Sequence, residues 1–362
     1  MAGVANISAS RTIGLAAVML ASVIVCLLIG IDIVSYRTVP PTRMRIEGDP
    51  LVSPDPEIGY VPRPRSRSRR IDRGPDGRIL VDYHVYTDRL GARVSRAGEE
   101  TPDRVDLLMV GDSFAWGHGV ENQDTFAAQV FHRLHATGAN LALGSYGTTQ
   151  ALQMLARNRT LRPRLVIYPF ISDHLQRNVD PCARSYYPFC LEYSHVAWRE
   201  GRRPEIVPPR RDGTARLQLQ VKAEREGLDP LTWFIHGIDV AVSRVTFLRS
   251  RRLASDVTRQ EAALEYLLDH MARAADALGS TLLVVYIPSG PPIAPPPGVV
   301  SRTAAGVGFR FLDLSESFRR YHETPRAAPL YIPNDGHPSV VGHTLIADGI
   351  EAFVVRERLI AR

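Results

Sequence analysis

From Val105 onward, apolar runs short enough to be strands alternate with longer stretches that have helical periodicity. The runs VDLLMV, RLVIYPFI and TLLVVYI are nearly continuous in apolar residues, which is typical of strands buried on both faces. Two further short runs, ANLAL and FRFLDL, complete the series. Strands that alternate with helices form a parallel sheet covered on both sides. The sequence therefore predicts an α/β fold around a central five-stranded parallel sheet.

The chain of 362 residues is long enough for one large domain with an insertion. Residues 101–362 are predicted to form that domain, and the insertion at about 178–254 is rich in Pro, Arg and aromatic residues without a clear period. Residues 37–100 are predicted to be a tether followed by a flanking strand pair that begins at Ile79. Within the tether, the basic run RPRSRSRR is interpreted as a solvated segment. Residues 1–11 are a short N-terminal tail.

Thr12 to Ile31 are consecutive uncharged, mostly apolar residues, about the length that crosses a bilayer core. We expect residues 12–36 to form a transmembrane anchor, with the lipid bilayer as a partner. A cleaved signal peptide is the alternative, but the run is long for one and no clear small-x-small cleavage site follows.

The orientation of this segment rests on two opposing signals. Arg37, Arg43 and Arg45 follow the apolar run, and a positive-inside count would keep the domain in the cytoplasm. Long domains, however, often translocate regardless of such charges. Cys182 and Cys190 share one loop at a spacing that permits a disulfide, which suits an oxidising compartment. We expect an extracytoplasmic, periplasmic domain.

Composition excludes several classes of function. The formal net charge is +6, but Lys222 is the only lysine, and this bias towards arginine resembles genome composition as much as selection for binding. There is no aromatic-interleaved basic stripe, so we expect no nucleic-acid partner. No His/Cys/Asp cluster has metal-ligand spacing and no glycine loop could cradle a phosphate, so neither a metal nor a cofactor is expected.

Polar candidates follow the ends of the predicted strands. Ser113 follows the first strand, Ser145 the second, and Ser172 with Asp173 the third, whereas 335–337 follow the fifth. Ligands bind at the carboxyl ends of parallel strands. These residues are therefore expected to meet at one rim of the sheet.

Chemistry at that rim would be nucleophilic. A serine hydroxyl attacks an ester only when an imidazole accepts its proton and a carboxylate orients that imidazole. Ser113 in VGDSFAWGHGV and the pair Asp335 and His337 in NDGHPSVVGH supply these three groups. The alternative is that the same residues serve only as turn and helix-cap residues.

With these motifs the chain resembles the SGNH, or GDSL, hydrolases, a family with a flavodoxin-like three-layer α/β/α fold. GDSFAWGHGV resembles the first block of the family, which implies Ser113 as nucleophile and its N–H as an oxyanion donor. DGHPSVVGH resembles the fifth block, which implies Asp335 and His337 as the other triad members. Many relatives place the acid three residues before the histidine, where this chain has Asn334.

The middle blocks depart from the family pattern. Ser145 stands where the oxyanion glycine is expected, and Ser172 stands where relatives have an asparagine. We expect the Ser145 N–H and the Ser172 hydroxyl to complete the oxyanion hole. Asp112, Asp173, His174 and Asn334 are possible site-lining residues. His174 could compensate for the missing carboxamide or be a structural hydrogen-bonder.

These patterns together predict a membrane-anchored serine esterase of SGNH type. It would hydrolyse an acyl ester, in our interpretation an acetyl ester on a carbohydrate or small molecule, or transfer the acyl group to a sugar hydroxyl. Two alternatives remain. One is a non-catalytic glycan-binding or assembly protein on the same scaffold, and the other is a lipid esterase or thioesterase.

Overall fold

The computed structural model describes residues 14–27, 29–30, 43–74, 76–183, 191–198, 203–209, 217–218, 221, 256–325 and 327–360. At its centre lies a five-stranded sheet in the order β15-β14-β9-β7-β8, with every neighbouring pair parallel. The strands are β7 (Leu107–Met109), β8 (Gly138–Asn140), β9 (Leu165–Phe170), β14 (Thr281–Tyr286) and β15 (Arg310–Asp313). The predicted parallel sheet of five strands is thereby confirmed.

The order of the strands follows their hydrophobicity. Central β9 is buried along its whole length, because both of its faces are covered. In edge strand β15, two half-buried residues lie between two exposed ones. The strands with the most apolar residues thus occupy the middle of the sheet.

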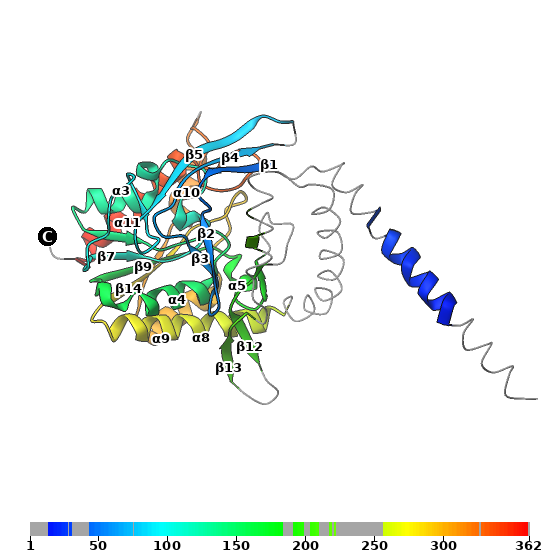
Figure 1. Cartoon of the computed structure of the whole chain (residues 1–362). Helices are drawn as coiled ribbons and strands as arrows, with labels where there is room; N and C mark the ends of the chain where they lie inside the picture. Colours follow the sequence, from blue (N-terminus) through cyan, green and yellow to red (C-terminus); the bar gives the residue numbers. More distant parts are fainter. Residues whose placement is uncertain are drawn as a thin grey trace, which may run out of the picture.

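Helices cover both faces and make three layers (Figure 1). On one side α3 (Phe126–Arg133) packs against α11 (Val340–Arg356), which also contacts α10 (Ser315–His322). On the other side α8 (Val257–Asp276) packs between α4 (Thr148–Arg157) and α9 (Gly298–Val307). Helix α8 buries Leu264, Leu267, Leu268 and Met271, one stripe at helical spacing. Two short 3-10 turns, Asn122–Asp124 and Arg159–Leu161, connect these elements.

A second sheet stands beside the first and is antiparallel, in the order β1-β4-β5-β6. Its strands are β1 (Arg43–Gly48), β4 (Arg67–Arg73), β5 (Ile79–Thr87) and β6 (Arg93–Val94). The β5–β6 pair matches the strand pair expected from Ile79. A small hairpin of β2 (Val52–Asp55) and β3 (Gly59–Pro62) precedes it.

The interpretation of RPRSRSRR as part of a tether is wrong, because residues 67–70 of this run belong to β4. Ser66 and Ser68 are buried whereas Arg67 and Arg69 are exposed, which is the period-two alternation of a strand. The buried positions are serines and not apolar residues. Their hydroxyls hydrogen-bond to each other and to the backbone of residues 49 and 50, which satisfies them inside the sheet.

The insertion is described only in part. Two hairpins are present, β10 (Cys182–Ala183) with β11 (Leu191–Glu192) and β12 (His195–Trp198) with β13 (Pro204–Val207). Cys182 is disulfide-bonded, whereas its predicted partner Cys190 lies outside the described residues. Cys26 is a free thiol.

The expected transmembrane anchor is also described only in part. Residues 14–27 and 29–30 are helical, and residues 1–13, 28 and 31–42 lie outside the described part. Within the helices that the structure describes, none combines the length and hydrophobicity that a bilayer crossing requires.

Candidate active site

Ser113 lies at a sharp turn between β7 and the short helix α2 (Ser113–Trp116). The Asp112 side chain caps this helix by accepting a hydrogen bond from the Phe114 N–H at 3.0 Å. Gly111 allows the turn, because a Cβ there would lie 3.0 Å from the Ala115 side chain. The serine hydroxyl is therefore presented at the carboxyl end of the sheet.

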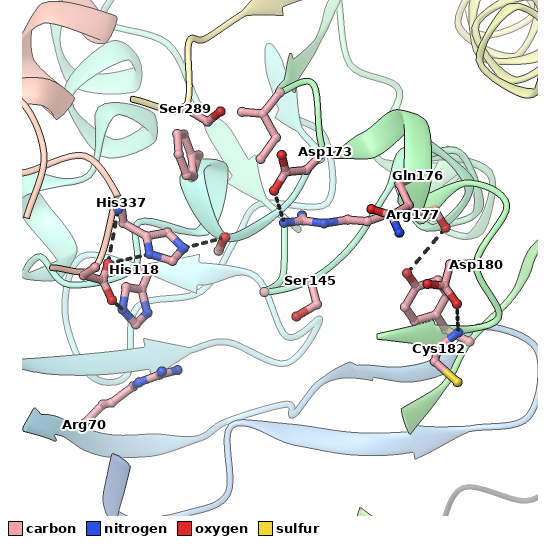
Figure 2. A pocket seen from close by; sticks show the side chains of 17 residues that line it. Arg70, His118, Ser145, Asp173, Gln176, Arg177, Asp180, Cys182, Ser289 and His337 are labelled. Atoms are coloured by element: carbon pink, nitrogen blue, oxygen red, sulfur yellow. Dashed lines mark hydrogen bonds and ion pairs between the residues drawn. The ribbon is translucent and has the colours of Figure 1, made fainter. Parts of the chain in front are cut away.

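Ser113, His337 and Asp335 come together across 224 positions of sequence. The His337 Nε2 lies 2.8 Å from the Ser113 Oγ, and its Nδ1 lies 2.6 Å from the Asp335 Oδ1. The His337 backbone N–H also donates to Asp335 Oδ1 at 3.1 Å. A carboxylate accepts, so Nδ1 carries the proton and Nε2 accepts from the serine hydroxyl. These are the geometry and the tautomer that a serine nucleophile needs (Figure 2).

The loop that carries Asp335 and His337 is a closed turn. The Ile332 N–H donates to the His337 carbonyl at 2.8 Å, and the Gly336 N–H donates back to the Ile332 carbonyl at 3.2 Å. Asn334 is exposed in the left-handed region at φ 62 and is not among the described hydrogen-bond partners of His337. Asp335, two residues before the histidine, is the carboxylate that orients it.

The electrostatics of the site favour an ionised Asp335. Burial alone would raise its pKa, but hydrogen bonds from His118 and His337 outweigh this and hold the pKa well below its usual range. The carboxylate is therefore charged at neutral pH and would stabilise an imidazolium at His337.

His118 is a member of the site that the sequence analysis left among scattered histidines. Its Nε2 lies 3.4 Å from Asp335 Oδ2 and 3.6 Å from Asp72 Oδ2, and its Nδ1 lies 3.2 Å from the Tyr83 hydroxyl. Its ring centroid is 4.2 Å from that of His337 (Figure 2). Burial, then the nearby His337, lowers the pKa of His118 to about 4, so it is neutral at pH 7. Asp72 and Tyr83 come from β4 and β5, so the second sheet reaches the triad.

Arg93 of β6 holds the loop that follows the nucleophile. Its Nη1 donates to the carbonyls of Trp116 and Gly117 at 2.7 and 2.6 Å, and its Nη2 donates to the Val120 carbonyl at 2.8 Å. Nε donates to the Asn122 side chain at 2.9 Å. Burial lowers the pKa of Arg93 to about 10, which still leaves it charged at neutral pH. No sequence motif marks this clamp.

Asp112 lies beneath the nucleophile in a buried charge cluster. Its Oδ2 is 3.2 Å from His174 Nε2 and 3.1 Å from Arg177 Nη1. Burial would raise the pKa of Asp112, but these two neighbours lower it to about 2. The His174 Nδ1 is 2.6 Å from the Tyr168 hydroxyl, and burial lowers the pKa of this imidazole. Asp112 and His174 therefore support the site from below, since neither is among the residues that line the cavity.

Ser145 and Ser172, the two serines that differ from the family pattern, lie in different surroundings. Ser145 lines the cavity in the left-handed region at φ 66, the conformation that a glycine would adopt without strain. The Ser172 hydroxyl lies 3.2 Å from the Tyr286 hydroxyl, and Ser172 is not among the cavity-lining residues. Ser145 thus has the place expected of an oxyanion donor, whereas Ser172 is turned towards β14.

A cavity of about 460 Å³ opens over the triad. Asp173 lines this cavity, as predicted. Asn334 does not line it and borders a neighbouring hollow instead. The lining combines the hydrocarbon side chains of Phe114 and Ile171 and the ring of Tyr193 with polar residues: Arg70, Ser113, His118, Ser145, Asp173, Gln176, Arg177, Asp180, Ser289, Asp335 and His337. The cavity has the size for a small acyl group and hydrogen-bonding groups for a polar one.

One group of side chains has the spacing of metal ligands. Ligand atoms of His118, Asp335 and His337 lie within 4.8 Å of one another. An ion bound there would take Asp335 or His337 out of the triad, so metal binding and triad chemistry exclude each other at this place.

The known proteins to which this chain is similar are distant in sequence. No family model and no curated relative matches the sequence. Similar solved structures include a GDSL-like lipase from Bacteroides thetaiotaomicron VPI-5482, with 11% identity, TM-score 0.34, and coverage of 72% of this chain and 94% of the lipase. An acetyl-xylooligosaccharide esterase from Geobacillus Stearmophilus has 13% identity, TM-score 0.38, and coverage of 71% and 96%.

A two-domain esterase active on acetylated mannans has 12% identity and a TM-score of 0.39, with coverage of 69% of this chain and 48% of the esterase. The solved structures to which the chain is similar are thus GDSL-type hydrolases and acetylesterases.

Proposed function

We propose that this chain is a serine esterase in which Ser113 is the nucleophile, His337 the general base and Asp335 the orienting acid. One observation carries the proposal: the continuous hydrogen-bonded series from Asp335 through His337 to Ser113, with separations of 2.6 and 2.8 Å. Turn and cap residues alone would have no reason to meet in this order beneath a cavity.

In the proposed reaction, the Ser113 oxygen attacks the ester carbonyl carbon while His337 Nε2 takes the hydroxyl proton. The carbonyl electrons move onto oxygen, and the N–H groups of Ser113 and Ser145 bind this oxyanion. His337 returns the proton to the departing alcohol. Water, deprotonated by His337, then releases the acyl group from Ser113; a sugar hydroxyl in place of water would make the enzyme an acyltransferase.

For the substrate we propose a small acyl ester, such as an acetyl group, on a carbohydrate or similar polyhydroxylated molecule. The support is the lining of the cavity: Phe114 and Ile171 are the hydrocarbon side chains among the described lining residues, and most others offer hydrogen bonds.

We further propose that the apolar segment from Thr12 to Ile31 tethers the enzyme to a membrane and that the domain lies outside the cytoplasm. The apolar run and the disulfide at Cys182 support this placement. In cells opened to the extracytoplasmic space, added protease should digest the domain. Protection until the cells are lysed would place the domain in the cytoplasm.

The activity is tested with full-length protein in detergent and p-nitrophenyl esters of increasing chain length. We expect hydrolysis of the acetate ester, its loss in Ser113→Ala, and labelling of the wild type but not the variant by a fluorophosphonate. Preference for long chains would favour a lipid esterase. A wild type that is neither active nor labelled would indicate a binding protein. Addition of an oligosaccharide acceptor, with mass analysis, distinguishes transfer from hydrolysis.

A further inference from the structure

The oxyanion hole of the proposed esterase lacks the side-chain donor that was expected at Ser172. The Ser172 hydroxyl faces Tyr286, whose own hydroxyl donates to the Ala294 carbonyl at 3.3 Å. The N–H groups of Ser113 and Ser145 remain as donors on two adjoining loops. A developing oxyanion in a site built this way would be stabilised by one more donor between those loops.

Arg177, in the last position of α5 (His174–Arg177), occupies the space between these loops. Its Nη1 donates to Asp112 Oδ2 and to the Tyr146 carbonyl, each at 3.1 Å. Asp112 directly precedes Ser113, and Tyr146 directly follows Ser145. The two bonds thus tie the guanidinium to both candidate N–H donors. Figure 2 shows the side chain running across the cavity towards His337, between Asp173 and Ser145.

The Nη2 and Nε groups of Arg177 are the part of the guanidinium that could bind a ligand. A guanidinium has five N–H donors, and the described hydrogen bonds from the Arg177 side chain all start at Nη1. The Nη2 lies 3.6 Å from Asp173 Oδ2, an ion-pair separation longer than a hydrogen bond, and Asp173 itself is largely exposed. Burial would lower the pKa of Arg177, but Asp112 and Asp173 outweigh it and raise the pKa, so the group is always charged.

We propose that Arg177 is the third oxyanion donor of this enzyme, a role that rests on the proposed esterase function. As the Ser113–carbon bond forms and the carbonyl electron pair moves onto oxygen, the Arg177 guanidinium donates from Nη2 or Nε to that oxygen. The serine proton goes to His337 Nε2, and Arg177 keeps its own proton throughout. The arginine takes the place of the missing carboxamide and adds a positive charge to it.

The test compares Arg177→Lys with the wild type, both full-length, using p-nitrophenyl acetate and phenylboronic acid. Lysine keeps the charge that Asp112 needs but loses the planar fork. We expect kcat to fall on the order of 10²-fold with KM within about twofold, because the donor acts on the transition state. The inhibition constant of the boronic acid, whose serine adduct mimics the tetrahedral intermediate, should rise by a similar factor.

Arg157→Lys is the matched control. Arg157 also pairs with a carboxylate, that of the half-buried Asp55 at 2.6 Å, but lies outside the cavity, so the kinetics of Arg157→Lys should equal those of the wild type. If Ser113→Ala abolishes hydrolysis while Arg177→Lys leaves kcat and boronate binding unchanged, the oxyanion role is refuted and the esterase stands. If the wild type has no esterase activity, the proposed function fails first.

A measurement on the wild type covers the case in which Arg177→Lys does not fold. A crystal structure after reaction with a fluorophosphonate should place the phosphoryl oxygen within about 3 Å of Arg177 Nη2 or Nε. An adduct oxygen bound by the N–H groups of Ser113 and Ser145 without Arg177 would overturn the inference.

Discussion

His118 Nε2 lies 3.4 Å from Oδ2 of Asp335, the carboxylate oxygen that His337 does not use. The imidazole is neutral, and its Nδ1 faces the Tyr83 hydroxyl. With Tyr83 donating to Nδ1, the proton of His118 is on Nε2 and points at the triad carboxylate. His118 therefore orients Asp335, which in turn orients His337.

Replacement of His118 should weaken catalysis through this orientation. We expect His118→Leu to lower kcat/KM roughly 10- to 100-fold, the usual cost of losing a partner that orients a catalytic group. His118→Gln, which keeps an N–H at the same reach, should recover most of the rate. Steady-state kinetics on folded protein measure kcat/KM for each variant. Equal values of kcat/KM for His118→Leu and the wild type would contradict the prediction.

Ser145 tests whether the oxyanion donor at this position is the backbone or the hydroxyl. Ser145→Gly keeps the N–H and removes the strain of φ 66, which costs roughly 1 kcal/mol or more for a non-glycine residue. We expect kcat within about threefold of wild type. A loss on the order of 10²-fold, the size of a missing oxyanion donor, would instead assign the role to the hydroxyl.

Loss of the Arg93 clamp should destabilise the loop behind the nucleophile. Arg93→Met leaves buried carbonyls of Trp116, Gly117 and Val120 without their donor, at about 1–3 kcal/mol for each unsatisfied group. We expect the free energy of unfolding to fall by about 3 kcal/mol or more. Denaturant titration gives this value, with a methionine at the exposed Arg104 (Arg104→Met) as the control. A decrease of less than about 1 kcal/mol in Arg93→Met would contradict the proposed role of Arg93.

The second sheet should be required for folding of the domain that carries the candidate active site. Ile46, Tyr83 and Val85 of this sheet are buried in the same apolar core as the central strands, each worth roughly 2 kcal/mol. A chain that begins at residue 101 should be insoluble or unfolded by circular dichroism, whereas one that begins at residue 43 should fold and hydrolyse p-nitrophenyl acetate. An active 101–362 fragment would show that the sheet is dispensable.

Stability should fall as the pH is lowered from 6.5 towards 4. Burial lowers the pKa of His118 to about 4 and that of His343 to about 3, so between those values and 6.5 the unfolded chain binds more protons than the folded one. Each histidine contributes at most about 1.4 kcal/mol per pH unit. The lowered pKa values of Asp112 and Asp335 act only below about pH 4, where their protonation removes further stability.

Thermal unfolding between pH 7 and 4 measures this slope. His343 accepts a hydrogen bond from the Phe126 N–H at Nδ1, and His343→Asn offers an oxygen that does not titrate in this range. The variant should show a shallower loss of stability with acid. If stability falls equally steeply with pH in the wild type and the variant, His343 has the same pKa in the folded and unfolded chains, and the prediction is wrong.

The short-range patterns of the sequence were sufficient for the central sheet and for the place of Ser113, Asp335 and His337. Strand and helix periods are properties of neighbouring residues, and parallel strands bring their carboxyl ends to one rim whatever the details of packing. The alternation that begins β4 was equally local, but the buried positions there are Ser66 and Ser68, which a search for apolar residues does not detect.

Tertiary packing alone decided which other groups reach that rim. His118 meets Asp72 and Tyr83 only because two sheets pack together, and Ser172 turns to Tyr286 while Arg177 turns into the cavity. Some of these contacts join residues more than a hundred positions apart. They depend on side-chain rotamers and strand register, and neither of these produces a periodic pattern in the sequence.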